Sequence, residues 1–266
     1  MKYILIALIV LLICILLSFL VLFLINKLTK KKIKKAFRIM IFIGNIILLI
    51  CVTLTIYVSI YYHADKNVKK YLNSSNEVVV TKIKEGYFFD GKDCDKAIIF
   101  YPGAKVEYTS YAPLMYELAL NGYDTFLIDM PFKMSMFGKN KADSIIKKYN
   151  YESYYISGHS LGGVVASSYA SSNDKIKGVI LLASYSTKTI DNKKVLSIYG
   201  SNDGVMNKKE YENNKKNLPS DYKEVIISGG NHSQCGCYGF QKKDKKATIS
   251  YFEQQKYIVD AIKEYF

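Results

Sequence analysis

The chain of 266 residues carries a net charge of +14, and half of its residues are hydrophobic. Residues 1–72 hold eleven Lys and Arg against one Asp, so most of the net positive charge lies near the N-terminus. This concentration indicates membrane topology and attraction to anionic headgroups. It argues against nucleic-acid binding, for which the sequence has no motif.

Two apolar segments open the chain. Ile4–Ile25 and Ile39–Tyr62 contain no charged residue. Each is long enough to cross a bilayer, which takes about 20 apolar residues, and neither has the polar face of a helix in a globular core. The first segment exceeds the roughly 7–15 residues of a signal-peptide core, and no small-residue cleavage site follows it. We therefore expect two transmembrane helices.

The loop between these segments, residues 26–38, holds six Lys, one Arg and no acid. Short loops rich in Lys and Arg stay in the cytoplasm, so the chain after Tyr62 is expected on the outer side of the cell membrane. Lys66, Lys69 and Lys70 follow the second segment on that side, but three basic residues against seven still favour this orientation. We expect residues 1–72 to form the anchor with a short polar tether, and residues 73–266 to form a catalytic domain.

After the tether, short apolar strands alternate with helices. The strands are expected at 78–84, 87–89, 97–101, 124–130, 154–157, 178–183, 195–199 and 225–227. The helices are expected at 108–120, 142–149, 161–172, 208–217 and 250–266. Such alternation predicts an α/β domain with a mostly parallel, doubly wound sheet and helices on both faces. No insertion between strands is long enough for a large lid.

One short motif follows the strand at 154–157. Gly158, Ser160 and Gly162 have the G-x-S-x-G spacing of a nucleophile elbow, and a helix begins directly after them. An elbow needs a strained turn that lifts the serine hydroxyl to the end of the sheet, with glycines that let strand and helix approach closely. The helix N-terminus adds partial positive charge near the developing anion. Ser160 is therefore the expected nucleophile.

A serine nucleophile needs a base, and the chain has only three histidines. His63 lies at the end of the second apolar segment, and His159 occupies the variable position of the elbow, where a packing role is expected. His232 follows the last strand on a glycine-rich loop. The order of the alpha/beta hydrolases is Ser, acid, His, and His232 fits the last place.

The acid should lie at the end of the preceding strand. Asp203 follows strand 195–199 in a turn, where it can orient the imidazole and stabilise its charged form. Asp191 lies at the wrong end of that strand, and Asp174 and Asp129 are weaker alternatives. For the oxyanion we expect two backbone amides, that of Leu161 after the nucleophile and that of Ala104 in the loop after strand 97–101, with Gly103 as the next choice.

Taken together, these segments resemble the alpha/beta hydrolase superfamily, and more narrowly a bacterial branch of small hydrolases. The similarity covers about residues 78–266. It is carried by the elbow and by the segments 100–106, 111–114, 183–185, 199–204 and 229–241. The resemblance implies a fold of about eight strands and a Ser-Asp-His triad. It does not fix a substrate, because the fold hosts esterases, lipases, thioesterases and lactonases.

The cysteines depart from this pattern. Cys235 and Cys237 stand where the family would have an aromatic residue and an acid. Cys14 and Cys51 lie within the apolar segments, which leaves Cys94, Cys235 and Cys237 in the polar part of the chain. Three is an odd number, so we expect free thiols or at most one labile pair.

The sequence thus predicts a membrane-anchored serine hydrolase that cleaves a small-molecule or lipid ester, possessing a triad of Ser160, His232 and Asp203. Two alternatives stay open: an acyltransferase with the same triad, and a non-catalytic binding module of the cell envelope on the same fold. No metal cluster, phosphate loop or nucleotide fingerprint is present, so no cofactor is expected.

Overall fold

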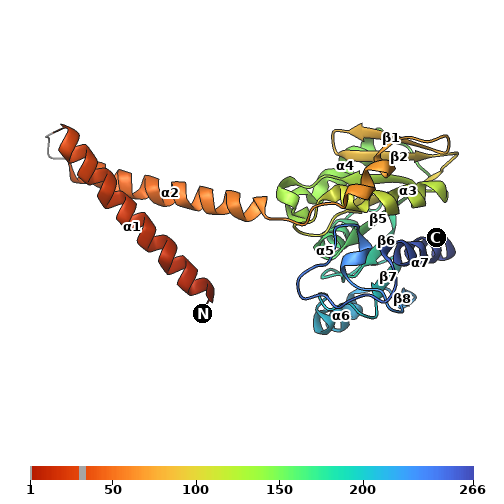
Figure 1. Ribbon diagram of the computed structural model, residues 1–266. Coiled ribbons are helices and arrows are strands. Elements are labelled where there is room, and N and C mark those ends of the chain that lie inside the picture. The colour runs from red at the N-terminus through yellow and green to blue at the C-terminus, as the bar shows by residue number, and fades with distance from the viewer. Residues whose placement is uncertain (1, 30–33) are drawn as a thin grey trace. The chain divides into compact units, whose positions relative to one another are not determined.

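The computed structural model describes residues 2–29 and 34–266, so residues 30–33 of the expected basic loop lie outside the described residues (Figure 1). The chain divides into two compact units, Met1–Ile60 and Tyr61–Phe266. Residues 61–72, expected from the sequence as part of the anchor and its tether, pack within the second unit instead. Tyr62 N donates to Lys105 O at 2.8 Å, and Glu107 N donates to Tyr62 O at 2.8 Å.

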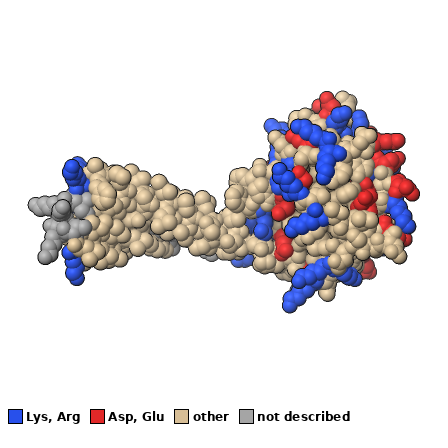
Figure 2. All heavy atoms as spheres, turned by 90° about the horizontal axis from the view of Figure 1, so that it is seen from above, with Lys and Arg blue, Asp and Glu red and all other residues tan. Residues whose placement is uncertain are grey.

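The first unit consists of two helices, α1 (Lys2–Thr29) and α2 (Lys35–Ser59). Both are long enough and apolar enough to cross a membrane, and no described residue of α2 is buried. Figure 2 shows the visible surface of both helices as almost free of charged side chains, apart from basic residues next to the connecting loop. Asn45 of α2 donates from Nδ2 to Ser18 Oγ of α1 at 3.1 Å, a polar contact between two otherwise apolar helices.

The second unit is built around one sheet of eight strands in the order β1-β2-β4-β3-β5-β6-β7-β8. The pairs β1·β2 and β2·β4 are antiparallel, and all other pairs are parallel. The strands are β1 (Val78–Ile83), β2 (Gly86–Gly91), β3 (Lys96–Tyr101), β4 (Asp124–Ile128), β5 (Ser153–His159), β6 (Ile176–Leu182), β7 (Lys194–Gly200) and β8 (Lys223–Ile227). The mostly parallel sheet predicted from the sequence is thereby confirmed.

Both faces of the sheet are covered, as the apolar strands require. Along β3, Ile98 and Phe100 pack on one face, while Ile99 and Tyr101 pack on the other, because successive side chains of a strand point to opposite sides. Helices α3 (Ala112–Leu120) and α7 (Tyr251–Tyr265) cover the first face. Helices α4 (Ala142–Lys148) and α5 (Leu161–Ala170) cover the second. Helix α6 (Lys208–Asn214) lies between β7 and β8 in the chain.

Several short 3₁₀ turns complete the unit. Tyr108–Tyr111 forms the first turn of the helix expected at 108–120, and α3 proper begins only at Ala112, with Pro113 in its first turn, where a missing amide proton costs nothing. Two further turns, Pro131–Lys133 and Ser135–Lys141, follow β4 and lead into α4. The remaining ones are Lys66–Leu72, Lys215–Asn217 and Ser233–Cys235.

Candidate active site

The candidate nucleophile lies on a tight turn between strand and helix. Ser160 directly follows β5 and precedes α5, and its backbone has φ 53° and ψ −124°. Few residues with a Cβ adopt this conformation, and such strain gathers at functional sites. Its amide donates to Leu182 O at 2.9 Å, and its carbonyl oxygen accepts from the Ser184 hydroxyl at 2.7 Å. The turn is therefore fixed from β6 and from the loop that follows it.

Two glycines make this tight turn possible. A Cβ on Gly158 would lie 2.4 Å from the carbonyl carbon of Gly162, and a Cβ on Gly162 would lie 2.1 Å from Tyr101 O. Real Cβ atoms do not approach other heavy atoms this closely. The start of α5 can pack against the ends of β3 and β5 only because both positions are glycine, as expected from the motif.

The expected acid and base meet at the same edge of the sheet. Asp203 follows β7 and His232 follows β8, and both strands run parallel to β5. His232 Nδ1 lies 2.8 Å from Asp203 Oδ2, and the two side chains are 1% and 0% exposed. The His232 ring also lies 4.5 Å from the ring of His159, the residue before Ser160. The structure thus brings the base from a distant loop to the elbow.

The second ring nitrogen of His232, Nε2, differs from Nδ1 in its hydrogen bonding. His232 Nε2 is buried and has no hydrogen-bond partner among the described residues. In free enzymes of this kind the bond from serine to histidine is often long, and it shortens when substrate binds. The structure therefore leaves Nε2 free to accept a proton, while Nδ1 is committed to Asp203.

The Asp203 carboxylate is held in its charged form by its partners. Burial alone would raise the pKa of Asp203, but the hydrogen bond and charge of His232 and two backbone amides outweigh it, so the pKa is lowered. Asp203 Oδ1 accepts from Val205 N and Met206 N, each at 2.8 Å. With Oδ1 held by these amides, Oδ2 is left to face the imidazole. A negative charge at this place stabilises the positive charge that His232 gains when it takes a proton.

The expected oxyanion donors differ in what they already bind. Gly103 N donates to Tyr111 Oη at 3.2 Å, so this amide is occupied. The amides of Leu161 and Ala104 take part in no hydrogen bond within the described part of the chain. Both follow the carboxyl ends of strands at the edge that carries Ser160. Of the two choices for the second donor, Gly103 already has a partner, so Leu161 and Ala104 stay the expected donors.

His159 has the packing role expected from its place in the elbow. Its side chain is 1% exposed, and Nδ1 lies 2.8 Å from Tyr111 Oη. Tyr111 Oη accepts from Gly103 N and shares a second hydrogen bond with His159 Nδ1. Burial, together with the nearby His232, lowers the pKa of His159 well below its usual value. His159 therefore stays neutral and ties the elbow to the loop of Gly103.

Asp244 holds the acid and base loops together, a role that sequence reasoning missed. Its Oδ1 accepts from Gly204 N at 3.0 Å and from His232 N at 3.3 Å, and its Oδ2 accepts from Ser233 N at 2.8 Å. The residue is 8% exposed although it stands in a run of four lysines, a composition typical of a solvated loop. No local pattern reveals these contacts, because the amides of Gly204, His232 and Ser233 lie 11 to 40 residues away in the chain.

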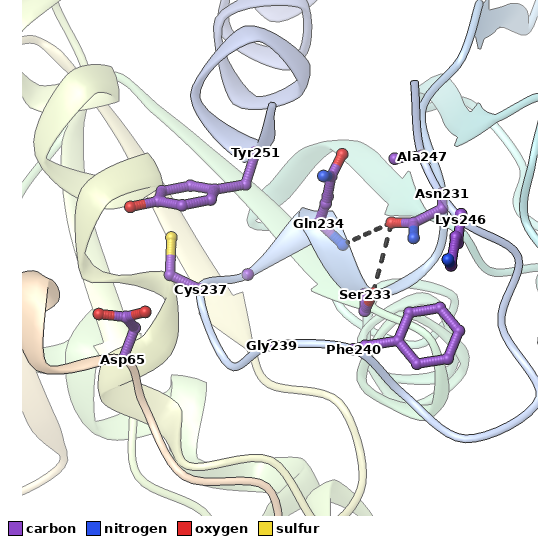
Figure 3. Close-up of a pocket in the computed structure, with 11 residues that line it drawn as sticks. Asp65, Asn231, Ser233, Gln234, Cys237, Gly239, Phe240, Lys246, Ala247 and Tyr251 are labelled. Atoms are coloured by element: carbon purple, nitrogen blue, oxygen red, sulfur yellow. Dashed lines mark hydrogen bonds between the residues drawn. The ribbon is translucent and has the colours of Figure 1, made fainter. Parts of the chain in front are cut away.

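Asn231 fixes the histidine loop from within. Its amide donates to Gln254 Oε1 and its carbonyl oxygen accepts from Gln254 Nε2, both at 2.8 Å. Its own Oδ1 accepts from Gln234 N at 3.0 Å and from Ser233 Oγ at 3.4 Å, as Figure 3 shows. Asn231, Ser233 and Gln234 line a pocket of about 350 Å³, and none of the residues expected in catalysis takes part in its lining.

The two neighbouring cysteines are free thiols. Gln254 Nε2 donates to Cys235 Sγ at 3.6 Å, and Gln255 Nε2 donates to Cys237 Sγ at 3.3 Å. Burial raises the pKa of Cys237 to about 12 and also raises that of Cys235. Neither thiol is therefore reactive at neutral pH. Among the described residues, no group of His, Cys, Asp and Glu is arranged to hold a metal ion.

A cavity of about 230 Å³ opens at Ser160. It is lined by residues of three segments: Ser160, Leu161 and Val164; Ala183, Ser184 and Tyr185; Val205, Met206 and Asn207. Most of these side chains are apolar, which suits the hydrocarbon part of a substrate. The volume lies below the roughly 300–1,000 Å³ typical of drug-sized ligands, so the cavity suits a small group.

The model of the family described as "Alpha/beta hydrolase family" matches residues 97–256, which hold the elbow, the acid turn and the histidine loop. The chain belongs to this family. No curated protein matches the sequence.

Solved alpha/beta hydrolase structures share this fold with the chain. A predicted CIB-like hydrolase from Thermoplasma acidophilum matches with a TM-score of 0.51 at 15% sequence identity. The match covers 70% of this chain and 99% of the Thermoplasma chain. Carboxyl esterase 2 from the mycorrhizal fungus Tuber melanosporum matches with a TM-score of 0.53 at 11% identity, covering 77% and 91%. Identities this low show a common fold, and the activity has to be argued from the site.

Proposed function

We propose that the chain is a membrane-anchored serine hydrolase that cleaves a carboxylic ester. Ser160 is the nucleophile, His232 the general base and Asp203 the acid that orients it. The observation that carries this proposal is the buried 2.8 Å contact between His232 Nδ1 and Asp203 Oδ2 beside a serine held on a strained turn. That arrangement fits the family's reaction, in which an acyl group passes through an enzyme-bound ester.

The reaction follows from the positions of these groups. Ser160 Oγ attacks the carbonyl carbon while its proton passes to His232 Nε2, and the amides of Leu161 and Ala104 bind the oxyanion. His232 returns the proton to the leaving alcohol, which leaves the acyl group on Ser160. Water then attacks this ester with His232 again as base, and the acid is released. Asp203 stays ionised throughout and stabilises the imidazolium.

The apolar lining of the cavity at Ser160 supports a substrate with a small, apolar acyl group. Val164, Val205 and Met206 line the cavity and offer no charged group to bind a polar acyl chain. A thioester has the same carbonyl geometry, and an oxygen ester is the commoner substrate of such sites. A screen of ester chain lengths on the whole protein in detergent identifies the preferred acyl group.

A fluorophosphonate probe tests the assignment of the nucleophile. The wild type should become labelled and Ser160→Ala should not. Ser220, an exposed serine on the loop before β8, provides the control, and Ser220→Ala should keep the label. Labelling that persists in Ser160→Ala would refute the assignment of Ser160 as the nucleophile. Product analysis with added alcohol separates hydrolysis from acyl transfer, because only transfer yields a new ester.

The two apolar helices support a membrane location with the second unit outside. Both pass the length and composition needed for a span, and the loop that joins them is strongly basic. Protease added to intact cells should remove the second unit from the anchor. Full protection of that unit, with digestion only after the cells are opened, would reverse the orientation.

A further inference from the structure

Three large apolar side chains stand exposed on the segment that follows β4. Phe132, Met136 and Phe137 are 61%, 51% and 60% exposed. The rings of Phe132 and Phe137 meet edge to face, with centroids 5.7 Å apart. Water-exposed aromatic pairs of this kind are costly for a soluble surface, and contiguous apolar patches usually mark a contact site. We call these three residues the aromatic patch.

The backbone holds the patch outward at a cost. Phe132 and Lys133 both have φ 54°, the left-handed region, which is strained for a residue with a bulky side chain. Folding tolerates this strain because the surroundings fix the segment. Lys105 N donates to Lys133 O at 2.8 Å, and the Ser135 hydroxyl donates to Pro102 O at 2.7 Å. The patch is thus a built feature of the fold.

The same segment is tied to the residues that leave the second apolar helix. Helix α2 ends at Ser59, and the ring of Tyr61 lies under Lys133 Nζ at 4.0 Å. Tyr62 N donates to Lys105 O, and Lys105 N donates to Lys133 O. Only Ile60 separates Tyr61 from the helix end. If α2 spans a bilayer, chain length alone places the neighbourhood of the patch near that membrane surface.

The charges around the patch fit an anionic surface. Residues 131–141 hold Lys133, Lys139 and Lys141 and no Asp or Glu. Lys139 Nζ donates to Ser168 Oγ and Lys141 Nζ to Asp129 O, and each ammonium keeps two further N–H donors for a headgroup. Aromatic side chains with flanking lysines are the composition that settles at the boundary of headgroups and hydrocarbon.

We propose that the aromatic patch inserts into the headgroup region of the bilayer that holds the anchor, with Lys133, Lys139 and Lys141 against anionic lipid headgroups. This inference rests on the membrane anchor of the proposed function. Being tethered by α2, the patch needs little affinity of its own, because the anchor keeps its local concentration at the membrane high.

The patch also has a consequence for the substrate. Through Lys133 and Ser135 it is bonded to the loop 102–105, which carries the Ala104 amide. Insertion of the patch would therefore bring this loop, which follows β3 at the same edge of the sheet as Ser160, toward the bilayer surface. Because the cavity at Ser160 is small, it suits a short acyl group. The substrate that we infer is an ester whose acyl part is short and whose alcohol part is a long hydrocarbon chain embedded in the membrane.

The absence of tryptophan from the chain allows a direct test. Phe132→Trp and Phe137→Trp each introduce a single indole into the full-length protein, which is reconstituted in mixed phosphatidylcholine and phosphatidylglycerol vesicles. Tyr257→Trp is the control, since Tyr257 is 53% exposed on α7, which covers the other face of the sheet from α5. We expect blue-shifted emission and quenching by brominated lipids at positions 132 and 137, and neither at 257.

A water-like emission at 132 and 137 without quenching overturns the membrane contact. Fluorophosphonate labelling of the same variants in detergent separates this result from the fate of the proposed function. Labelled but unquenched protein refutes only the patch, while quenched protein that never labels refutes only the hydrolase. Two probe positions guard against a variant that fails to fold.

The double variant Phe132→Ser, Phe137→Ser tests the consequence for substrate. Its hydrolysis of a butyryl ester of a long-chain alcohol in vesicles should fall several-fold, whereas a water-soluble butyryl ester should be cleaved at the wild-type rate. An equal loss on both esters would show that the patch acts on the fold or the site and not at the membrane.

Discussion

Asp203 Oδ2 lies 2.8 Å from His232 Nδ1, and both side chains are closed off from solvent. This contact sets which imidazole nitrogen, Nε2, is left without a hydrogen-bond partner among the described residues. Asp203→Asn keeps the size of the side chain but replaces the carboxylate by a neutral amide. If the amide NH₂ faces His232 Nδ1, the ring proton moves to Nε2, and Nε2 can then no longer accept the serine proton. We expect kcat to fall by roughly 10³–10⁴-fold, with little change in KM.

Steady-state kinetics on the preferred ester measure this loss, and circular dichroism checks that the variant folds. A variant with wild-type kcat would show that Asp203 is not part of the triad.

Asp244 should support the same reaction from a distance. Its carboxylate accepts amide protons from both the acid turn and the histidine loop, so Asp244→Asn sets an NH₂ group against a backbone N–H. We expect a loss of about 1–3 kcal/mol in unfolding free energy. We also expect a lower kcat, because both loops gain freedom, with an unchanged KM.

A matched control for Asp244 is Asp191→Asn, an exposed aspartate at the opposite end of β7. The free energy of unfolding of Asp191→Asn should stay within about 0.5 kcal/mol of the wild-type value, and this variant should keep full activity. If Asp244→Asn behaves like Asp191→Asn, the loops are held by their own backbone contacts and Asp244 is dispensable.

His159 predicts a specific dependence of stability on pH. Its folded pKa lies well below the usual value of about 6.5, so the folded state keeps this side chain neutral while the unfolded chain protonates it. The contribution of neutral His159 to the free energy of unfolding is fully present above about pH 6.5. As the pH drops below about 6.5, the free energy of unfolding decreases by up to about 1.4 kcal/mol per pH unit. His159→Gln removes this loss. Thermal unfolding in detergent should therefore show a steeper fall in Tm toward about pH 5.5 for the wild type than for the variant; parallel curves would contradict the assignment.

The cavity at Ser160 should set the preference for acyl length. Val164 lies one turn into α5 and lines the cavity beside Leu161. Val164→Phe fills part of its small volume, so esters of longer acyl groups should lose far more of their kcat/KM than acetyl esters. Val164→Ala should shift the preference the other way. A uniform loss across chain lengths would mean that the acyl group binds elsewhere.

Local pattern was enough for much of the fold and of the candidate site. Each strand was marked by a short apolar run, and the elbow was marked by two glycines that no other residue type can replace. With only three histidines, His232 followed by elimination, and the end of β7 then pointed to Asp203. These inferences work because the carboxyl ends of parallel strands meet at one edge, whatever the detailed packing.

Other features depended on contacts between distant segments. The sequence placed Ala104 before Gly103 as the second oxyanion donor, but only the structure shows that Tyr111 Oη occupies the Gly103 amide. The sequence grouped residues 61–72 with the anchor and its tether, although Tyr62 pairs with the loop at 105–107. It also gave no sign that Asp244, which stands between lysines, is buried. What the sequence by itself determined was the order of elements and the chemical groups at their ends. Which of those groups meet, and which aromatic side chains stay uncovered, was decided only when the sheet brought its loops together.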